Sequence, residues 1–436
     1  MRLAALSLPG LLLVGAAVLA AIPFAAPAEA PSSPSTGRPL LVTIDDLPVA
    51  SPKLHTDPAD REEVTRKLLE ILKAHKVPAA VFTIWGQVKG PKDTALLDRY
   101  RAAGHELGNH SFGHLDLPRT PVAAYVEDIE RGRAGLAGYL APHRLEVRFF
   151  RFPYLREGET GEQWDAVRKA LRASKQRVMP VTIDTQDWSF EEPYVAAVRR
   201  GDATAARDVA ADCLAALKLE VRRHEERGDD LFGRQTPQIL LLHANAVGTA
   251  VWDDLFSWLK RTGHRFATAD EVLADPAFSE EPRFLARYGC SLWDRIGHER
   301  EAKESAAAIR KLIADQVEAW NRGDLVAFTN VYDDDATFLS PTGSVRGRQA
   351  VHERYTKRYP DRAAMGTLKL EIDDIRPVWG MEITPGGDAV PGRIHGASAS
   401  GRWTLSYPDR EAATGRTLLV LSRAGTRWTI VQDASM

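Results

Sequence analysis

The chain has 436 residues, and its formal net charge of -2 at pH 7 is close to neutral. It contains no basic stretch with interleaved aromatic residues, which argues against a nucleic acid partner. Its two cysteines cannot form a cysteine-rich zinc site. About 400 residues remain after the leader described below, which predicts two domains, or one large and one small domain.

The N-terminal segment has the layout of a signal peptide. An early arginine precedes an apolar run rich in Leu, Ala and Val, and small residues including "APA" follow. Proline and glycine interrupt the run, which is shorter than the roughly 20 apolar residues of a spanning helix. We expect residues 1–28 to be removed after Ala28, with Ala30 as the alternative site. The mature protein is then expected to lack a stable membrane span and to be secreted or periplasmic in a bacterium.

Strands and helices are predicted to alternate after a Pro/Ser-rich linker over residues 29–38. "LLVTIDDLP" and "PAAVFTIWG" are typical of buried strands, and "REEVTRKLLEILKAHKV" between them has apolar residues at helical spacing. The alternation continues through "VRFFRFPY", "DTQDW" and "QILLLHANAVG", with a helical excursion over residues 191–234. This order predicts a parallel sheet wrapped by helices, and the strand number favours a (β/α) barrel over an open sheet.

The pattern changes after residue 280. We place a linker at residues 281–304 and a second domain at residues 305–436. This domain begins with a long amphipathic helix, a turn at "NRGD" and a second helix, and it continues with several strands. Helices followed by strands with hairpin signals predict a smaller α+β domain with a curved sheet.

Polar residues follow several of the strands predicted for the first domain. Because the carboxyl ends of barrel strands share one rim, these side chains are expected to converge. Each has a structural explanation when taken alone, since an aspartate after a strand is often a turn cap and a histidine that closes an apolar strand is often structural. The residues are Asp45, Asp46, Arg151, Asp184, Asp187 and His243.

One reaction uses all of these residue types, namely metal-assisted hydrolysis of an amide or ester. The two histidines of "HSFGH" are four residues apart, a spacing that permits coordination of one ion. Asp46, His110 and His114 would give a site with three ligands and room for water. Asp45 suits the base and His243 the acid that protonates a departing nitrogen. Zinc suits the ligands best, and cobalt or nickel are alternatives.

The ordered set "TIDDLP", "HSFGH", "RFPY", "DTQDW" and "LLLH" resembles the polysaccharide deacetylase family, the NodB-type carbohydrate esterases. The resemblance covers roughly residues 40–275, and we place this domain at residues 39–280. It implies a distorted (β/α) barrel that removes acetyl groups from an N-acetylated glycan.

The same resemblance assigns roles to positions of this chain. It implies that Asp45 is the base, that His243 is the acid, and that the metal ligands are Asp46, His110 and His114. It further implies that Arg151 fixes the Asp45 carboxylate, and that a carboxylate of "DTQDW", Asp184 or Asp187, tunes His243.

On the substrate side, Trp188 and Leu241 would line the slot for the acetyl methyl group. The backbone N–H of Tyr154 would help to stabilise the oxyanion.

Four residues depart from the family pattern. Leu47 replaces a glycine, and a leucine does not easily take a positive φ, so the turn or the strand end must differ. Leu155 replaces a glycine after "PY", and Ala244 and Asn245 follow the histidine where the family has aspartate. These departures remove no ligand, base or acid, but they reshape the rim.

The tail from about Ser305 resembles the SnoaL-like group of the NTF2 superfamily. "VEAWNRGDLVAFTNVYDDDATFLSPTGSVRGRQAVHERY" and "RWTIVQD" carry the likeness. It implies a cone-shaped sheet with a pocket that Asp335, Asp433 and Trp403 could face, and a possible homodimer through this domain. A binding or dimerising role without chemistry is the expectation here.

The sequence therefore predicts an exported, metal-dependent deacetylase of a chitin- or peptidoglycan-like glycan. One alternative keeps the fold and metal but cleaves another amide or an O-acetyl ester. The other is an inactive carbohydrate-binding barrel, which would have lost a ligand, the base or the acid. Whether Cys213 and Cys290 pair is left open.

Overall fold

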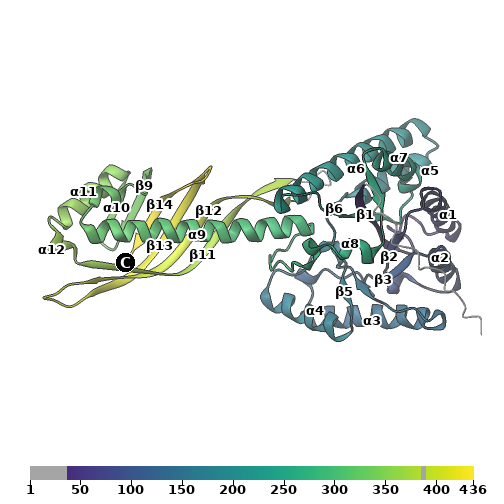
Figure 1. Ribbon diagram of the computed structural model, residues 1–436, viewed down its shortest axis with the longest axis horizontal. Coiled ribbons are helices and arrows are strands. Elements are labelled where there is room, and N and C mark those ends of the chain that lie inside the picture. Colours follow the sequence, from purple (N-terminus) through teal and green to yellow (C-terminus); the bar gives the residue numbers. More distant parts are fainter. Residues whose placement is uncertain (1–36, 384–388) are drawn as a thin grey trace, which may run out of the picture. The chain divides into compact units, whose positions relative to one another are not determined.

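The computed structural model describes residues 37–383 and 389–436 (Figure 1). The predicted signal peptide at 1–28 and most of the predicted linker at 29–38 lie outside these residues. Within the described part of the chain, no helix has both the length and the apolar character needed to cross a membrane.

The first domain is built on a sheet of eight strands that pair in parallel. The order across the sheet is β5-β4-β3-β2-β1-β7-β6, and β8 also pairs with β1. The predicted distorted (β/α) barrel is confirmed, and its distortion is that the curled sheet stays open. Among the described residues, no pairing between β5 and β6 closes it. The strands are Arg38–Leu47 (β1), Ala79–Thr83 (β2), Glu106–Asn109 (β3), Phe149–Phe150 (β4), Arg177–Val178 (β5), Ile183–Asp184 (β6), Gln238–His243 (β7) and His264–Phe266 (β8).

Helices connect these strands and surround the sheet (Figure 1). Their ends follow local sequence signals: in α1, the Asp57 side chain accepts a hydrogen bond from the Ala59 N–H, and Pro58 occupies the first turn. The predicted helical excursion over residues 191–234 is confirmed as α5 and α6. The helices are Pro58–His75 (α1), Pro91–Ala102 (α2), Val122–Leu140 (α3), Gly161–Ala173 (α4), Glu191–Arg199 (α5), Ala203–Phe232 (α6), Gly248–Arg261 (α7) and Ala269–Leu273 (α8).

Strand β1 is buried on both faces, which fixes the position of its carboxyl end. Leu40, Val42 and Ile44 lie in a core that includes residues of α1 and α7, whereas Leu41 lies in a second core with residues of β2 and α8. Successive side chains of a strand point to opposite faces, and a parallel sheet covered on both faces needs apolar residues at nearly every position. The polar residues that follow this apolar run are therefore held at a rigid edge of the sheet.

Helix α9 (Leu292–Arg322) contributes to the cores of both domains. Trp293 and Ile296 pack in the core of the first domain, and Ile309 and Ile313 pack in the core of the second. This differs from the predicted linker at 281–304 and the predicted boundary at 305. The helix contains no proline, so nothing in its backbone interrupts it at the point where the composition changes.

The second domain has the predicted α+β architecture, with a six-stranded sheet in the order β10-β9-β14-β13-β12-β11. Helix α9 packs against this sheet, most extensively against β11 (Figure 1). The sheet and its remaining helices are Leu325–Thr329 (α10), Tyr332–Ser340 (β9), Gly343–Arg346 (β10), Arg348–Arg358 (α11), Arg362–Met365 (α12), Thr367–Ile383 (β11), Ala389–Ser406 (β12), Ala413–Ala424 (β13) and Arg427–Ser435 (β14).

The pocket predicted for this domain is present, and two of the three residues predicted to face it do so. Asp433 and Trp403 line a cavity of about 350 Å³. Asp335 is exposed on β9 and is not among the lining residues, so that prediction is wrong. Asp335 lies between the buried Tyr332 and Ala336 but, like Asp334, it is exposed to solvent.

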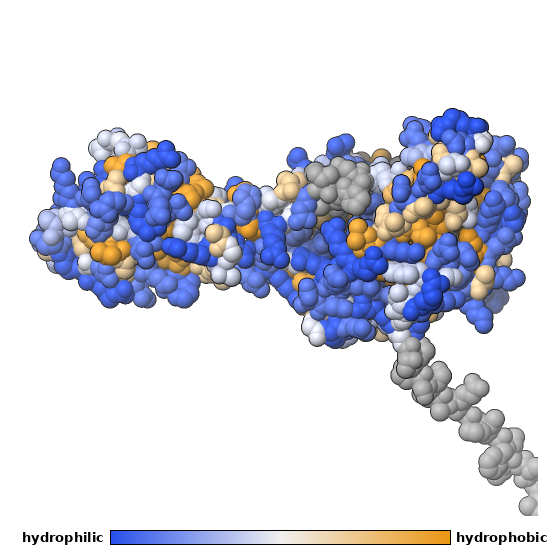
Figure 2. Space-filling model, turned by 90° about the horizontal axis from the view of Figure 1, so that it is seen from above, coloured by the Kyte–Doolittle hydropathy of each residue, from blue (hydrophilic) through white to orange (hydrophobic). Residues whose placement is uncertain are grey.

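The surface and the cysteines complete the description. The face shown in Figure 2 is mostly hydrophilic, with apolar side chains in small separate patches. Isolated apolar side chains are normal on soluble domains.

Cys213 and Cys290 are both buried free thiols, so the pairing that the sequence left open is not seen.

Candidate metal and catalytic site

The end of β1 presents two adjacent carboxylates. Asp45 is buried, and Asp46 has a positive φ of 67°, which an aspartate tolerates better than most residues. Leu47 is fully buried in the core and pairs with Thr83 of β2 after a register shift that follows Ile44. The strand therefore ends differently from the family turn: the bulge and Asp46 supply the turn, and Leu47 supplies core packing.

The "HSFGH" segment is a turn after β3 and not a helix. The Gly113 N–H donates to the Asp128 carboxylate at 2.9 and 3.0 Å, and the His114 N–H donates to Ser111 Oγ at 3.0 Å. His114 itself has a positive φ of 55°. One side chain within the turn and one outside it thus hold a strained backbone, which is common at functional sites. The two imidazole centroids lie 4.8 Å apart, so the histidines converge from a turn.

Asp46, His110 and His114 come together as a possible metal site. Asp46 Oδ1 lies 3.4 Å from His110 Nε2 and 3.5 Å from His114 Nε2, and the three potential ligand atoms lie within 4.8 Å of one another. This buried oxygen has no hydrogen-bond partner in the described part of the chain. A buried polar atom without a partner is costly, and a cation would satisfy it.

The protonation of these side chains also suits a cation. The His110 Nδ1–H donates to the Arg151 carbonyl oxygen at 2.9 Å, which directs the Nε2 lone pair to the site. Burial lowers the pKa of His114 to about 4, so this imidazole is neutral at pH 7. Burial alone would raise the pKa of Asp46, but His114 and His110 outweigh it and hold that pKa well below its usual range. Two imidazoles and one carboxylate form a donor set that fits Zn²⁺ or a related divalent ion.

Arg151 holds the Asp45 carboxylate in place. Its Nη1 lies 3.2 Å from Asp45 Oδ2, and its Nη2 donates to Thr43 Oγ1 at 3.0 Å. Its Nε donates to the Met179 carbonyl oxygen at 2.9 Å, and the side chain is 1% exposed. Asp45 Oδ2 is also 3.7 Å from His110 Nε2, which places this carboxylate beside the possible metal site.

The carboxylate that contacts His243 is that of Asp187. His243 Nδ1 lies 2.6 Å from Asp187 Oδ1, and the His243 backbone N–H donates to Asp187 Oδ2 at 3.0 Å. Burial alone would lower the pKa of His243, but Asp187, with Asp46 and Asp45, raises it to about 10. At neutral pH this imidazole therefore carries the proton that a general acid needs.

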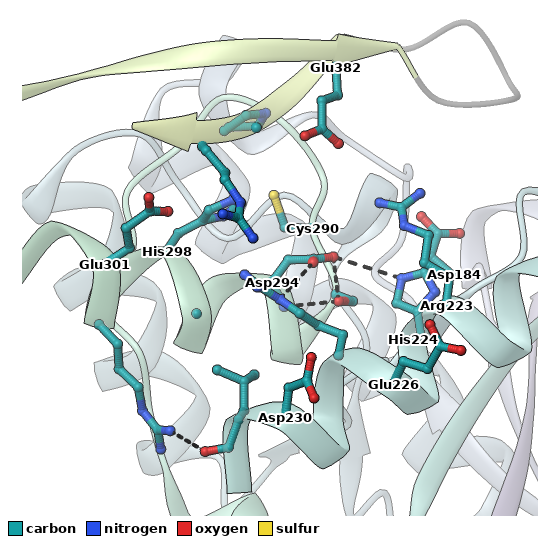
Figure 3. Close-up of a pocket in the computed structure, with 18 of the residues that line it drawn as sticks. Asp184, Arg223, His224, Glu226, Asp230, Cys290, Asp294, His298, Glu301 and Glu382 are labelled. Atoms are coloured by element: carbon teal, nitrogen blue, oxygen red, sulfur yellow. Dashed lines mark hydrogen bonds and ion pairs between the residues drawn. The ribbon is translucent and has the colours of Figure 1, made fainter. Parts of the chain in front are cut away.

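Asp184, the other carboxylate of "DTQDW", faces a different set of side chains. It lines a polar pocket that also contains His224 of α6 and Asp294 of α9 (Figure 3). Its Oδ1 accepts a hydrogen bond from the Gln186 N–H, and burial raises its pKa. Of the two aspartates, the structure therefore gives Asp187 the contact expected of the residue that tunes the histidine.

The three residues predicted for the substrate side differ in exposure. Tyr154 is 52% exposed, has a positive φ of 57°, and lies with its ring centroid 4.5 Å from that of His114. It is the second residue of a short helical turn, where a backbone N–H has no partner within the helix. Trp188 is 43% exposed directly after Asp187, whereas Leu241 is buried on β7.

Sequence reasoning missed the residues that hold Asp187 and the loop after His243. The Asn245 side-chain amide donates to Asp187 Oδ2 at 2.9 Å, and its Oδ1 accepts from the Gly248 N–H at 2.9 Å. The Glu191 carboxylate accepts from two backbone N–H groups of the same loop and pairs with His55 at 2.7 Å. The departure at position 245 was the available signal, because an amide can donate where the family aspartate cannot.

Two family models match this chain. Residues 32–173 match the polysaccharide deacetylase model, and residues 313–433 match the SnoaL-like domain model. The strand after β4, the "DTQDW" segment and His243 lie beyond the first match, so their correspondence rests on the geometry given above.

Curated relatives resemble the first domain. A chitooligosaccharide deacetylase from Rhizobium leguminosarum bv. trifolii is 28% identical over 155 residues, which is 36% of this chain and 61% of the relative. A peptidoglycan-N-acetylglucosamine deacetylase from Bacillus cereus is 32% identical over 131 residues, 29% of this chain and 42% of the relative. The chain thus spans about half the length of these relatives.

Among solved structures, an NTF-2-like protein of unknown function from Shewanella oneidensis MR-1 resembles this chain. The two are 28% identical, and the match covers 30% of this chain and 98% of that protein with a TM-score of 0.25.

Proposed function

Because the chain carries a polysaccharide deacetylase domain matched over residues 32–173 and a SnoaL-like domain matched over residues 313–433, we propose that it is a metal-dependent hydrolase that removes N-acetyl groups from an N-acetylated glycan. The substrate class is chitin-like or peptidoglycan-like, in keeping with the names of the relatives. The observation that supports it best is that a possible base, a possible metal site and a possible acid meet at one edge of the sheet. Asp45, held by Arg151, lies beside Asp46 and the two histidines. His243, held by Asp187, lies at the end of the neighbouring strand.

In the proposed mechanism, Asp46, His110 and His114 hold a divalent cation, which supplies Lewis-acid activation of water and of the acetyl carbonyl. Asp45 takes the proton of the attacking water, and Arg151 keeps this carboxylate oriented. Zn²⁺ is the cation that we propose first.

The second half of the reaction depends on His243. A nitrogen anion is a poor leaving group, so the proton of the His243 imidazole is transferred to the departing amide nitrogen as the C–N bond breaks. Asp187 keeps that imidazole protonated and in one tautomer. The products are acetate and a primary amine on the sugar. The Tyr154 N–H and the exposed Trp188 are proposed to bind the acetyl group, with Leu241 behind them.

We also propose that the protein acts outside the cytoplasm, in the periplasm or after secretion. The signal-peptide layout of residues 1–28 supports this proposal. The proposal includes a homodimer through the second domain.

A second candidate is hydrolysis of another amide or of an O-acetyl ester by the same residues. Leu155 has a positive φ of 53° at the rim, and Ala244 and Asn245 replace the family's aspartate. These differences change the walls of the site but leave its ligands, base and acid in place. An inactive carbohydrate-binding barrel has less support, because none of those groups is missing.

The test is acetate release from N-acetylglucosamine oligomers and peptidoglycan fragments, with metal-loaded and chelator-stripped protein and with Asp45→Asn beside them. We expect acetate only from the metal-loaded native chain. Acetate release that persists at the native rate in Asp45→Asn would contradict the mechanism. If the metal-loaded chain releases no acetate from glycans, a panel of acetylated amides and esters with mass detection separates the second candidate from an inactive barrel.

A further inference from the structure

The second domain encloses a cavity of about 350 Å³ whose walls are largely aromatic. Helix α9, helices α10 and α11, and the concave face of the second sheet provide the lining. A cavity of this size holds a molecule with one or two rings. The aromatic residues are Trp320, Phe328, Phe338, Tyr355, Tyr359 and Trp403.

A carboxylate, that of Asp433, lies inside this mostly apolar cavity. The pairing of β13 with β14 shifts in register between Val420 and Leu421, so one residue of β14 bulges out. After the bulge the alternation changes phase: Ile430 faces inward, Gln432 faces outward and Asp433 faces inward again. Asp433 is only 5% exposed. A specific backbone irregularity therefore delivers an acidic side chain into the core of this domain.

Hydroxyl groups surround the Asp433 carboxylate. The Tyr332 hydroxyl donates to Oδ2 at 2.7 Å, and Ser435 Oγ and Thr417 Oγ1 donate to Oδ1 at 2.7 and 3.2 Å. Three donors stabilise the charged form, whereas burial raises the pKa of this carboxyl. No Lys, Arg or His side chain forms an ion pair with Asp433 among the residues that the structure describes. A buried carboxylate is normally paired with a cation, and here the described residues supply none.

The aromatic walls provide the other half of a cation site. The negatively charged faces of Trp and Tyr rings attract ammonium groups, more strongly when water is excluded. Trp320, Tyr355 and Tyr359 pack edge to face or stacked, with ring centroids 4.9 to 6.2 Å apart, so they form one connected wall. The indole N–H of Trp403 is buried and has no hydrogen-bond partner in the described part of the chain. That free donor suits an oxygen of a bound molecule.

We propose that this cavity binds a small ring compound that carries a primary ammonium group, with the ammonium at Asp433 and the ring against the aromatic wall. The inference rests on the second domain alone. It also connects the two domains chemically, because the proposed deacetylation leaves a primary amine on a sugar ring.

Two arginines also line the cavity and favour the opposite charge. The Arg354 guanidinium donates to Ser340 Oγ at 3.0 Å and lies 5.1 Å from the Phe338 ring. Arg358 Nε donates to the Tyr359 hydroxyl at 3.2 Å. Both already have partners, and neither pairs with Asp433, which leaves the carboxylate as the charge without a counter-ion. An anionic ligand held by these arginines is the competing outcome of the test.

The experiment is calorimetric titration of the full chain with three probes of equal size: benzylamine, benzyl alcohol and benzoate. Glucosamine and N-acetylglucosamine form a second matched pair. We expect at least one of the amines to bind at least 10-fold more tightly than its neutral partner, and benzoate to bind more weakly than benzylamine. Asp433→Asn keeps the size of the side chain and removes its charge, and it should weaken amine binding at least 10-fold.

Asp335→Asn is the matched control, because it removes an exposed carboxylate from the same domain. It should bind the amines as the native chain does, and thermal unfolding of both variants checks that they fold. Equal binding of amines and their neutral partners, tighter binding of benzoate, or native amine binding by Asp433→Asn would each overturn the proposal. Binding or turnover of N-acetylglucosamine in the first domain is common to the native chain and both variants, so the effect of Asp433→Asn does not depend on whether that domain deacetylates glycans.

Discussion

His243 Nδ1 lies 2.6 Å from Asp187 Oδ1, and the same aspartate accepts the His243 backbone N–H through its other oxygen. This pair fixes the position, tautomer and charge of the proposed acid at once. Asp187 is 1% exposed, so its carboxylate is shielded from water and acts strongly on the imidazole.

Asp187→Asn is expected to shift the alkaline limb of the activity profile to lower pH. Asp187, together with Asp46 and Asp45, raises the pKa of His243 from 6.5 to about 10, so the imidazole holds its proton throughout the neutral range. Without the carboxylate charge, the proton is lost at lower pH, and the acid form disappears as pH rises past that value. We expect kcat at pH 8 to fall by roughly 100-fold or more. The measurement is kcat against pH from 5 to 10; an unchanged alkaline limb would contradict the role of Asp187.

The same pair makes a stability prediction. A pKa that folding raises contributes stability that is complete below the unfolded value of 6.5 and is lost as pH rises through 10. The metal-free native chain should therefore lose more unfolding free energy between pH 7 and 10 than Asp187→Asn does. Urea titrations at pH 6, 8 and 10 measure this difference.

Asn245→Ala is expected to lower kcat by roughly 10-fold with little change in KM, since losing a hydrogen bond to the partner of an active-site residue typically has an effect of this size. Asn245 donates to Asp187 at 2.9 Å and ties that carboxylate to the start of α7, but it contacts no proposed substrate group. Asn245→Asp places a second carboxylate at the same distance, and the repulsion should disturb Asp187 more than the alanine does. A larger effect on KM than on kcat would assign Asn245 to substrate binding instead.

Metal retention should be insensitive to pH near neutrality and decline in acid. Burial lowers the pKa of His114 from 6.5 to about 4, so protons compete for this ligand only as pH falls towards 4. In the metal-free chain the unfolded state takes up this proton near 6.5 and the folded state does not, so stability falls as pH falls between 6.5 and 4. Metal content after dialysis at pH 8, 7, 6, 5 and 4 tests whether metal retention is insensitive to pH near neutrality. Loss of half the metal between pH 8 and 7 would contradict this prediction.

Two variants separate the metal ligand from the base. His110→Ala should lose both metal and activity, whereas Asp45→Asn should keep metal and lose activity, because Asp45 is bound by Arg151 beside the ligand set. Metal analysis by mass spectrometry and acetate release on the same samples give both readouts. Loss of metal from Asp45→Asn would place Asp45 among the ligands.

The sequence predicts those parts of the site that depend on strand ends. Asp45, Asp46 and His243 follow apolar strands, and the carboxyl ends of parallel strands share one edge, so their meeting could be anticipated. The choice between Asp184 and Asp187 could not, because both are aspartates of one short segment and only tertiary contacts separate them.

Other parts depend on contacts or irregularities that leave no pattern in the sequence. The turn at Asp46 requires a bulge that places Leu47 in the core, and a bulge likewise turns Asp433 inward. Asn245 acts through a residue 58 positions away. The domain boundary was misplaced because composition changes near residue 305, whereas the helix is continuous from Leu292 to Arg322.

Trp293→Ala tests whether the start of this continuous helix belongs to the first domain. Trp293 is fully buried in the core of the first domain, and its Nε1–H donates to Gln238 Oε1 at 3.0 Å. The substitution removes the indole, leaves a cavity and takes one of two donors from a buried acceptor that Thr182 also contacts, which should cost ~3–5 kcal/mol of unfolding free energy. Leu219→Ala is the matched control on α6, because Leu219 is 53% exposed and its loss should change stability by less than about 0.5 kcal/mol.

Urea unfolding followed by circular dichroism and tryptophan fluorescence measures both variants. If residues 281–304 were a linker, Trp293→Ala would behave like Leu219→Ala. A large loss confined to the first domain would instead show that α9 completes that domain, since Ile296 one turn later packs in the same core. A chain that ends at residue 280 should then fail to fold stably, even though it contains every residue of the proposed active site.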